Sequence, residues 1–212
     1  MLPRSIQHLI DEFAKLPSVG PRQAARFVFY LLNEPREEIE KFAKKLFILK
    51  KVKYCHFCNK CIEPVSAHVT TKLDLCEICK DKNRDRSTIC VIEKDTDIES
   101  IERTKRYNGI YYVIGTEDEN VQLNRLKNLV LRIKKSPSTN SGQIKKLNEI
   151  IIATNATTEG EIIALYAARQ FEELKKTYPE LKITRLGRGL STGSELEYMD
   201  EDTLTNALLG RK

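Results

Sequence analysis

The chain has 212 residues, 41% of them hydrophobic, and a net charge of +6. A chain of this length can bury one large or two small hydrophobic cores. Its apolar runs all fall short of the ~20 residues that a membrane-spanning helix needs. A membrane protein is therefore excluded, and because the N-terminus carries no secretory signal we expect a soluble protein of the cytoplasm.

The charge is unevenly distributed along the chain. Residues 1–54 contain eleven lysines and arginines against six acidic residues, whereas residues 191–212 contain two against five. An excess of positive charge favours an anionic partner for the N-terminal part, although a lysine-rich face is often only solvated. The acidic end of the chain is expected to serve a different purpose.

The first third of the chain has the apolar spacing of three helices. The first stripe comprises Ile6, Leu9, Ile10 and Phe13, with Ser5 as the expected N-cap. The segment Leu16-Pro-Ser-Val-Gly-Pro21 is too rich in proline and glycine to be helical, and Pro21 suits the first position of a second helix. A third helix is expected to open at Pro35.

Two helices joined by a short hairpin that contains glycine form a helix-hairpin-helix. Backbone N–H groups of such a hairpin, and of the helix that follows it, can bind a phosphate oxygen. Arg22 and Arg26 are four residues apart and share one face of the second helix, where they can add charge-assisted hydrogen bonds. We therefore predict a DNA-binding site at Arg22 and Arg26 that is indifferent to base sequence. An ordinary helical hairpin with solvated arginines is the alternative.

Four of the six cysteines form two Cys-x-x-Cys pairs. Cys55-His-Phe-Cys58 is followed after seventeen residues by Cys76-Glu-Ile-Cys79. This spacing is typical of a structural zinc site in which four thiolates complete a tetrahedral shell and leave no open position for catalysis. We predict one Zn²⁺ per chain held by Cys55, Cys58, Cys76 and Cys79. A disulfide framework fits poorly with a cytosolic chain.

The other two cysteines have different surroundings. Cys61 extends the first pair, and His68 lies between the two pairs, so that either could replace one of the four ligands. Cys90 lies within the apolar run Thr88–Ile92 and is expected to pack in a hydrophobic core.

Beyond the second cysteine pair the pattern changes to strands that alternate with helices. The expected strands are 88–93, 109–114, 149–153 and 181–186, and the expected helices are 95–106, 121–134 and 159–176. The helix at 121–134 has one apolar face, formed by Leu126, Leu129, Val130 and Ile133. Such alternation is typical of a mostly parallel α/β sheet, in which sites form at the C-terminal ends of the strands. Glu93 and the segment Thr154–Glu161 occupy such ends.

Those two segments resemble the Toprim fold of topoisomerases, primases and certain nucleases. In its catalytic members the second segment reads Asp-x-Asp-x-x-Gly, and these aspartates hold Mg²⁺ together with the first glutamate. Here Asn155 and Thr157 stand at the two aspartate positions, while Glu159, Gly160 and Glu161 remain. The resemblance therefore implies a non-catalytic Toprim domain. The alternative is a nuclease or primase that uses Glu93, Glu159 and Glu161 around a single Mg²⁺.

The order of motifs along the whole chain resembles the RecR family of bacterial recombination mediators. The matching motifs are the hairpin Leu16–Arg22, the four-cysteine segment, the strand Ile89–Glu93, and the segments Ala153–Glu161, Thr184–Gly189, Gly193–Tyr198 and Ala207–Arg211. The resemblance implies a protein without enzymatic activity that closes into a ring of two or four subunits. Such a clamp binds single- and double-stranded DNA and acts with RecO or RecF to help load RecA onto strands coated by SSB. Association with the nucleoid is expected for the same reason.

The resemblance also assigns roles to residues and segments. It maps the basic pair of the hairpin to Arg22 and Arg26, and it places Glu93, Glu159 and Glu161 on the face that binds RecO or RecF. It divides the chain into a helical DNA-binding domain at 1–53, a zinc finger at 54–80, a Toprim domain at 87–188 and an oligomerisation tail at 189–212. The tail has apolar residues at helical spacing near the terminus, which require a partner surface or a place on the chain's own domain. The resemblance favours exchange of this tail between subunits. A zinc-bearing scaffold that never binds DNA is a further alternative, and the basic N-terminal part argues against it.

Three features depart from the family pattern. Ser18 stands where the family hairpin usually has glycine, which matters if the backbone there needs a positive φ. The loop between Cys58 and Cys76 is longer than usual, and the loop after Gly115 is shorter.

Overall fold

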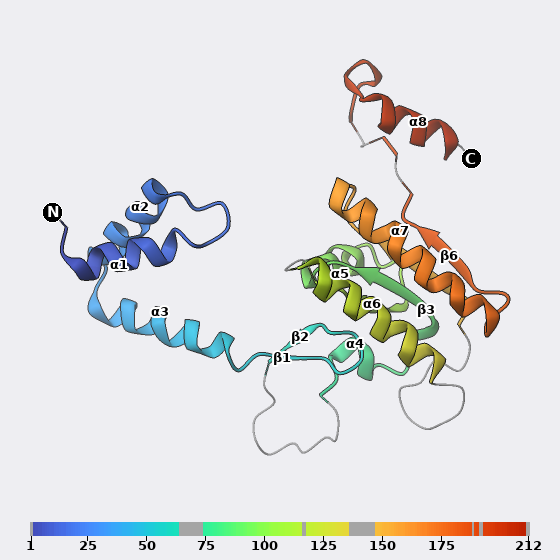
Figure 1. Cartoon of the computed structure of the whole chain (residues 1–212), viewed down its shortest axis with the longest axis horizontal. Helices are drawn as coiled ribbons and strands as arrows, with labels where there is room; N and C mark the ends of the chain where they lie inside the picture. Colours follow the sequence, from blue (N-terminus) through green and yellow to red (C-terminus); the bar gives the residue numbers. More distant parts are fainter. Residues whose placement is uncertain are drawn as a thin grey trace. The chain divides into compact units, whose positions relative to one another are not determined.

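A computed structural model describes residues 2–63, 74–115, 118–135, 147–187, 189–190 and 193–210 (Figure 1). The chain divides into two compact units, residues 1–52 and residues 53–212. Within the described ranges, no helix combines the length and the apolar character that crossing a membrane requires.

The first unit confirms the three predicted helices. They are α1 (Arg4–Phe13), α2 (Pro21–Leu32) and α3 (Arg36–Leu49). Ile10 of α1 is buried against Ala24 and Val28 of α2, and the rings of Phe13 and Phe27 meet edge to face at 5.9 Å. Pro21 occupies the first turn of α2, as predicted, because that position needs no backbone N–H. The prediction of Ser5 as an N-cap was wrong: α1 begins at Arg4, two residues earlier than that cap implies, and Pro3 occupies the cap position without a side-chain hydrogen bond.

The hairpin between α1 and α2 contains a residue in the left-handed region. Ser18 has φ of 63°. This conformation costs a non-glycine residue about 1–2 kcal/mol because its Cβ approaches the following carbonyl oxygen. The departure from the family pattern at this position therefore has a structural consequence.

We expect Ser18→Gly to stabilise the chain. Relief of the left-handed strain outweighs the ~0.5–1 kcal/mol that glycine loses in backbone entropy, so the free energy of unfolding should rise by about 0.5–1 kcal/mol. Thermal melting of the purified variant measures the change. Ser5→Gly, which places glycine inside α1, is the matched control and should lower the melting temperature. A melting temperature of Ser18→Gly below that of the wild type would contradict the expectation.

The second unit contains a four-stranded parallel sheet with the order β4-β3-β5-β6. Its strands are β3 (Asp85–Ile92), β4 (Gly109–Val113), β5 (Glu149–Ala153) and β6 (Lys182–Arg185). Its helices are α5 (Asp95–Arg103), α6 (Glu119–Lys134), α7 (Thr158–Glu172) and the short 3-10 helix η1 (Glu173–Lys176). The predicted parallel α/β sheet is thereby confirmed. The helix predicted at 95–106 ends at Arg103, because Lys105 adopts a left-handed conformation with φ of 53°.

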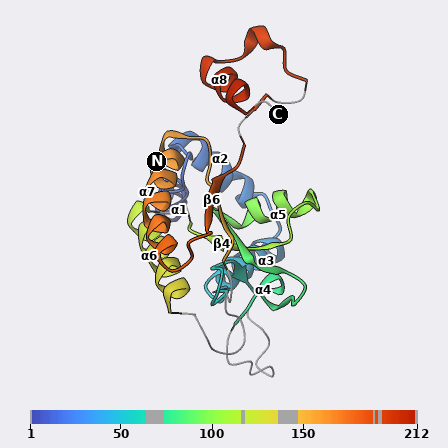
Figure 2. The ribbon, with the colours of Figure 1, turned by 90° about the vertical axis from the view of Figure 1, so that its right-hand side faces the viewer.

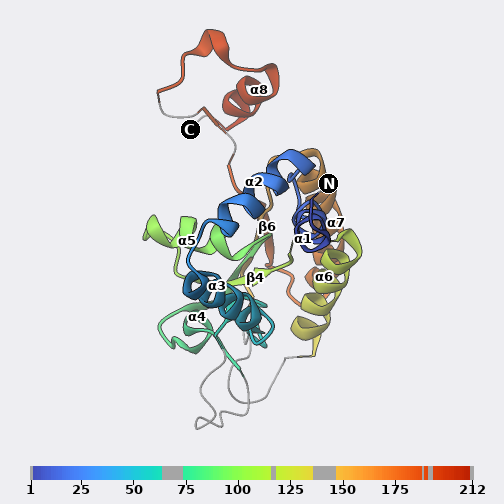
Figure 3. The same cartoon turned by 90° about the vertical axis from the view of Figure 1, so that its left-hand side faces the viewer.

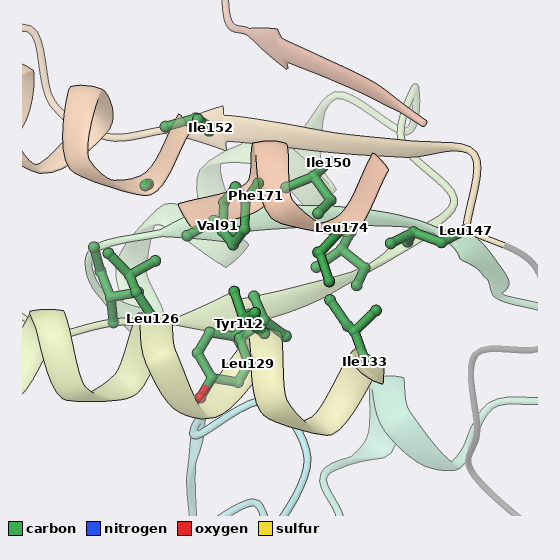
Figure 4. Close-up of a cluster of buried hydrophobic side chains, with 14 of the residues drawn as sticks. Val91, Tyr112, Leu126, Leu129, Ile133, Leu147, Ile150, Ile152, Phe171 and Leu174 are labelled. Atoms are coloured by element: carbon green, nitrogen blue, oxygen red, sulfur yellow. The ribbon is translucent and has the colours of Figure 1, made fainter. Parts of the chain in front are cut away.

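Helices cover both faces of the sheet. Helices α6 and α7 lie on one face and α5 on the other, as the two views from opposite sides agree (Figures 2 and 3). The larger core lies beneath α6 and α7, where Phe171 and Leu174 meet Leu126, Leu129 and Ile133 (Figure 4). The apolar stripe predicted on α6 is buried in this core. A smaller core beneath α5 contains Ile98 and Cys90.

A small cysteine-rich structure precedes the sheet and contacts its edge. We call it the cysteine module and define it as residues 53–63 and 74–80. It contains the antiparallel strands β1 (Lys53–Tyr54) and β2 (Cys61–Ile62) and the short helix α4 (Glu77–Lys80). The N–H of Val113, in the edge strand β4, donates to the Cys58 carbonyl oxygen at 2.8 Å. Arg132 of α6 donates to the carbonyl oxygens of His56 and Phe57. The cysteine module is therefore anchored to the sheet and to α6.

The described part of the C-terminal segment, residues 193–210, forms no core of its own. It contains the 3-10 helix η2 (Leu196–Tyr198) and the helix α8 (Glu201–Leu209), whose N-cap Asp200 accepts from the N–H of Thr203 at 2.8 Å. From residue 193 onward, no described side chain is buried. Apolar side chains are among the exposed ones, and Tyr198 is 78% exposed. The partner surface expected for the tail stays a prediction.

Candidate functional site

The four paired cysteines converge in the cysteine module. Their sulfur atoms all lie within 4.8 Å of one another, and all four side chains are buried. Cys55 and Cys58 come from the turn after β1, whereas Cys76 and Cys79 come from the start of α4. Backbone N–H groups point at the sulfurs: Cys76 donates to Cys55 Sγ at 3.3 Å, and Cys79 donates to Cys76 Sγ at 3.4 Å. Such N–H groups stabilise thiolates.

The proximity of the four sulfurs has an electrostatic consequence. Hydrogen bonds from the neighbouring thiols, Cys58 first, lower the pKa of Cys55 far below its usual range. The same interactions, with Cys55 first, raise the pKa of Cys58. Four sulfurs at this separation cannot all ionise by themselves, whereas a bound cation deprotonates every coordinating thiol. The buried set of four sulfur donors therefore suits a thiophilic metal ion with a closed shell.

The two other cysteines do not belong to the described cluster of four sulfurs. Cys61 lies in β2 and is exposed. Its backbone N–H instead donates to Asp95 Oδ2 at 3.1 Å, which ties the cysteine module to the start of α5. His68 lies outside the described residues. Cys90 is buried in the smaller core, as predicted, and burial raises its pKa to about 12.

A second group of polar side chains lies where β3, β4 and β5 end. We call this region the carboxyl edge and define it as residues 93–95, 115, 118–119 and 154–161. Ile92 of β3 pairs with Ala153 of β5, so the residues that follow each strand lie side by side. Helix α5 leaves β3 toward one face of the sheet and α7 leaves β5 toward the other. In parallel α/β folds, ligands bind where neighbouring strands send their connections to opposite faces.

Glu93 and Asn155 are joined at this edge by two hydrogen bonds. The backbone N–H of Asn155 donates to Glu93 Oε1 at 2.7 Å, and its side-chain amide donates to Glu93 Oε2 at 2.5 Å. Glu93 is only 7% exposed. Both carboxylate oxygens of a buried glutamate are thus occupied by donors from one residue.

An acidic hollow of about 340 Å³ opens beside this pair. It is lined by Glu93, Asp118, Glu119, Gln122, Thr157, Glu159, Gly160, Ile162 and Ile163. The structure therefore brings Glu93 and Glu159 to the same hollow. It does not bring Glu161 into the hollow, because the Glu161 carboxylate forms a two-fold ion pair with Arg185 at 2.8 and 2.6 Å.

Asp118 and Glu119 also line the hollow, although no sequence motif identified them. Asp118 is the N-cap of α6 and accepts from the N–H of Asn120 at 2.6 Å. Both residues follow β4, so the rule that the C-terminal ends of parallel strands share one edge could have identified them.

The three glutamates considered for a single Mg²⁺ do not meet at the carboxyl edge. Among the described residues, only the four cysteines form a cluster of three or more ligand atoms close enough for one metal ion. Glu93 accepts hydrogen bonds from Asn155, and Glu161 forms an ion pair with Arg185. The three glutamates named for a single Mg²⁺ therefore do not converge.

The hairpin of the first unit exposes both predicted arginines. Arg22 and Arg26 lie on the exposed side of α2, and neither forms an ion pair with another described residue. No side chain caps the start of α2, so its first N–H groups remain available to an outside acceptor. At Gly20, a Cβ would meet nothing within 4 Å, so the approach to these N–H groups is open.

The first unit also has an apolar groove of about 400 Å³. It is lined by Phe13, Phe27, Tyr30, Leu31, Ile39 and Phe42, with Glu34 and Glu38 at its margin. The apolar side chains at the end of α3 are exposed as well, and Phe47 reaches 75%. None of the residues of α3 is buried. The helices of this unit thus expose an apolar surface.

Comparisons with known proteins find related sequences along the chain. Residues 6–47 match the RecR helix-hairpin-helix, residues 87–187 match the Toprim domain, and residues 189–212 match the RecR C-terminal region. The chain is 39% identical over 215 residues to the recombination protein RecR of Clostridium perfringens, in strain 13 and in strain ATCC 13124. That similarity covers 99% of this chain and 96% of each relative.

Proposed function

The chain belongs to the RecR family of recombination proteins, and on that premise we propose that it is a non-catalytic mediator of recombinational DNA repair. In this proposal it binds single- and double-stranded DNA irrespective of sequence. It forms a ring-shaped clamp in the cytoplasm, associated with the nucleoid, and acts with RecO, RecF or both to help load RecA onto strands coated by SSB.

The observation that carries this proposal is the exposed hairpin of the first unit. Two unpaired arginines and the uncapped start of α2 offer positive charge and N–H donors side by side. A phosphate group uses both, and contacts to phosphates carry no sequence information. Arg22 and Arg26 are therefore the proposed DNA-binding residues.

The absence of catalysis is supported by the chemistry of the carboxyl edge. Metal-assisted phosphoryl transfer needs hard oxygen ligands around Mg²⁺, and Asn155 and Thr157 supply no carboxylate at the two aspartate positions. The test is incubation of single- and double-stranded DNA with the protein in Mg²⁺ or Mn²⁺. We expect intact DNA. Cleavage that disappears in Glu93→Gln would support the Toprim nuclease instead.

We propose that the metal of the cysteine module is one structural Zn²⁺ per chain. Four buried thiolates complete its tetrahedral shell, so no position remains for water or substrate. The ion would hold together a module that has almost no hydrophobic core besides the cysteines.

The acidic hollow is the proposed contact for RecO or RecF. Glu93 and Glu159 line it together with Asp118 and Glu119, and the neighbouring Ile162 is 53% exposed. Such a surface suits a segment with a cationic side chain beside an apolar one. Glu161, the third glutamate assigned to partner binding, would act through its ion pair with Arg185.

We expect deletion of residues 191–212 to lower the oligomeric state by at least one step. The tail exposes apolar side chains that have no core of their own, and exchange between subunits would bury them. The apolar groove of the first unit offers a second self-contact, and two different interfaces can close a ring. Light scattering of the intact and truncated chains measures the change in mass.

Two further measurements accompany this deletion. Zinc content should be unchanged, because the tail does not contribute to the cysteine module. Retention on circular DNA should fall, because an open assembly can dissociate from a circle that a closed ring would enclose. A truncated chain with the mass of the full-length assembly would rule out exchange of the tail.

A further inference from the structure

The carboxyl edge contains an amide where catalytic Toprim domains have a carboxylate that binds Mg²⁺. We propose that Asn155 takes over the structural role of the cation. In this proposal its amide and backbone N–H hold the Glu93 carboxylate against the start of α7, so that the carboxyl edge is assembled without any divalent metal.

The negative charge of Glu93 is compensated by hydrogen bonds from Asn155. A buried carboxylate is costly unless it is paired or hydrogen-bonded. Glu93 is 7% exposed, and the two N–H groups of Asn155 supply one donor to each of its oxygens, at 2.7 and 2.5 Å. A carboxamide nitrogen is a hydrogen-bond donor and carries no lone pair for a metal ion. The pair therefore meets the need for positive potential at Glu93 without a cation.

The contact between Glu93 and Asn155 is also too close to admit a divalent cation. Mg²⁺ requires oxygen ligands at about 2.0–2.1 Å in octahedral geometry and usually retains several waters. Direct hydrogen bonds between Glu93 and Asn155 leave no room for such an ion between them. A Cβ at Gly160 would collide with the Asn155 carbonyl oxygen and would lie 3.1 Å from Glu93 Oε1. The loop is thus packed closely around the pair.

The hydrogen bonds of the loop extend the arrangement to α7. Thr157 caps the helix by accepting from the N–H of Gly160 at 3.2 Å, and the Thr154 hydroxyl donates to the Gly160 carbonyl oxygen at 3.0 Å. The position of Glu159 in the acidic hollow follows from this loop. A role of this arrangement in binding RecO or RecF rests on the proposed function. That the carboxyl edge needs no divalent metal is a statement about stability, and it is tested without a partner.

Three variants test the proposal by thermal melting of the full-length chain. Asn155→Asp places a second carboxylate against Glu93, and Asn155→Ala removes the amide donor. The exchanged pair Glu93→Gln with Asn155→Asp reverses the amide and the carboxylate. In that pair the introduced glutamine accepts the backbone N–H of residue 155 through its side-chain oxygen and donates to the introduced aspartate through its amide.

Each variant has a defined expectation in millimolar MgCl₂ compared with NaCl of equal ionic strength. The wild type should melt at the same temperature in both salts. Asn155→Asp should melt roughly 5–10 °C lower in NaCl and recover in MgCl₂, because the ion separates the two carboxylates. Asn155→Ala should melt roughly 2–5 °C lower in both salts. The exchanged pair should regain most of the wild-type melting temperature in NaCl.

Two results would overturn the proposal. One is a wild-type melting temperature that rises in MgCl₂ and not in NaCl, since the edge would then use a cation. The other is an Asn155→Asp variant that behaves like Asn155→Ala in both salts. If Asn155→Asp does not fold in either salt, the melting temperatures of the wild type in the two salts and of the exchanged pair in NaCl still test the proposal. Added salt is used in place of a chelator because a chelator would also strip zinc.

Discussion

Cys79→Ser is expected to leave the chain without bound metal and with an unfolded cysteine module. A structural Zn²⁺ site supplies about 10–16 kcal/mol of binding free energy in small zinc-binding peptides, and that energy is folding energy for the surrounding segment. Removal of one thiolate opens the closed shell of a module whose buried residues are the four cysteines themselves. Elemental analysis should fall from about one zinc per chain to almost none, and Cys55→Ser should behave alike.

The loss should extend beyond the cysteine module. Val113 of β4 donates to the Cys58 carbonyl oxygen, and Arg132 donates to those of His56 and Phe57. Once the module unfolds, the N–H of Val113 loses its partner and the edge of the sheet becomes available to other strands. We therefore expect a lower melting temperature and aggregation at micromolar concentration, measured by circular dichroism and light scattering.

The matched control is Cys61→Ser. Cys61 is a neighbouring cysteine whose thiol lies outside the cluster, so this variant should keep its zinc and its melting temperature. His68→Ala should keep its zinc as well. Loss of zinc in Cys61→Ser together with retention in Cys58→Ser would show that Cys61, and not Cys58, is a ligand.

The double variant Arg22→Ala with Arg26→Ala is expected to weaken DNA binding by about 10- to 100-fold at low salt. Each arginine that contacts a phosphate releases counterions and contributes about 0.9 to the slope of log K against log salt on duplex DNA. The slope should therefore decrease by up to about 1.8. Titrations of labelled DNA at several salt concentrations measure both quantities, and the melting temperature should not change because both side chains are exposed.

A control variant removes the same charge elsewhere in the first unit. Arg36 and Lys41 of α3 are exposed and paired with Glu40 and Glu38. Arg36→Ala with Lys41→Ala should therefore change affinity much less than the hairpin variant. Equal losses would show that net charge alone drives binding.

Unchanged binding in the hairpin variant would locate the DNA site elsewhere. Arg84 is no candidate, because it is largely buried and pairs with Glu102. Arg86 donates to the Cys79 carbonyl oxygen at 2.7 Å and supports the cysteine module. The exposed Lys50 and Lys51, which follow α3, and Lys53, which pairs with Asp74, would be the next variants to test.

The sequence by itself determined the helices, the strands and the four-cysteine site, because each depends on residues that are close together in the chain. The stripe Leu126, Leu129, Val130 and Ile133 predicted the buried face of α6, because residues three and four apart share one side of a helix. The strand predicted at 149–153 was confirmed to the residue. The cysteine spacing predicted the four-sulfur cluster, since two short turns present two sulfurs each. Local signals were wrong at helix ends, where Pro3 replaced Ser5 as the cap and Lys105 ended α5 early.

Only the tertiary structure decided which polar groups meet. Glu161 and Arg185 are far apart in sequence, and their ion pair depends on how α7 lies beside β6. Asp118 and Glu119 enter the acidic hollow because β4 ends at the same edge as β3 and β5. The sequence showed that two aspartates are missing, but not that Asn155 donates to Glu93 in their place. Such contacts depend on strand register and helix placement, which no local periodicity encodes.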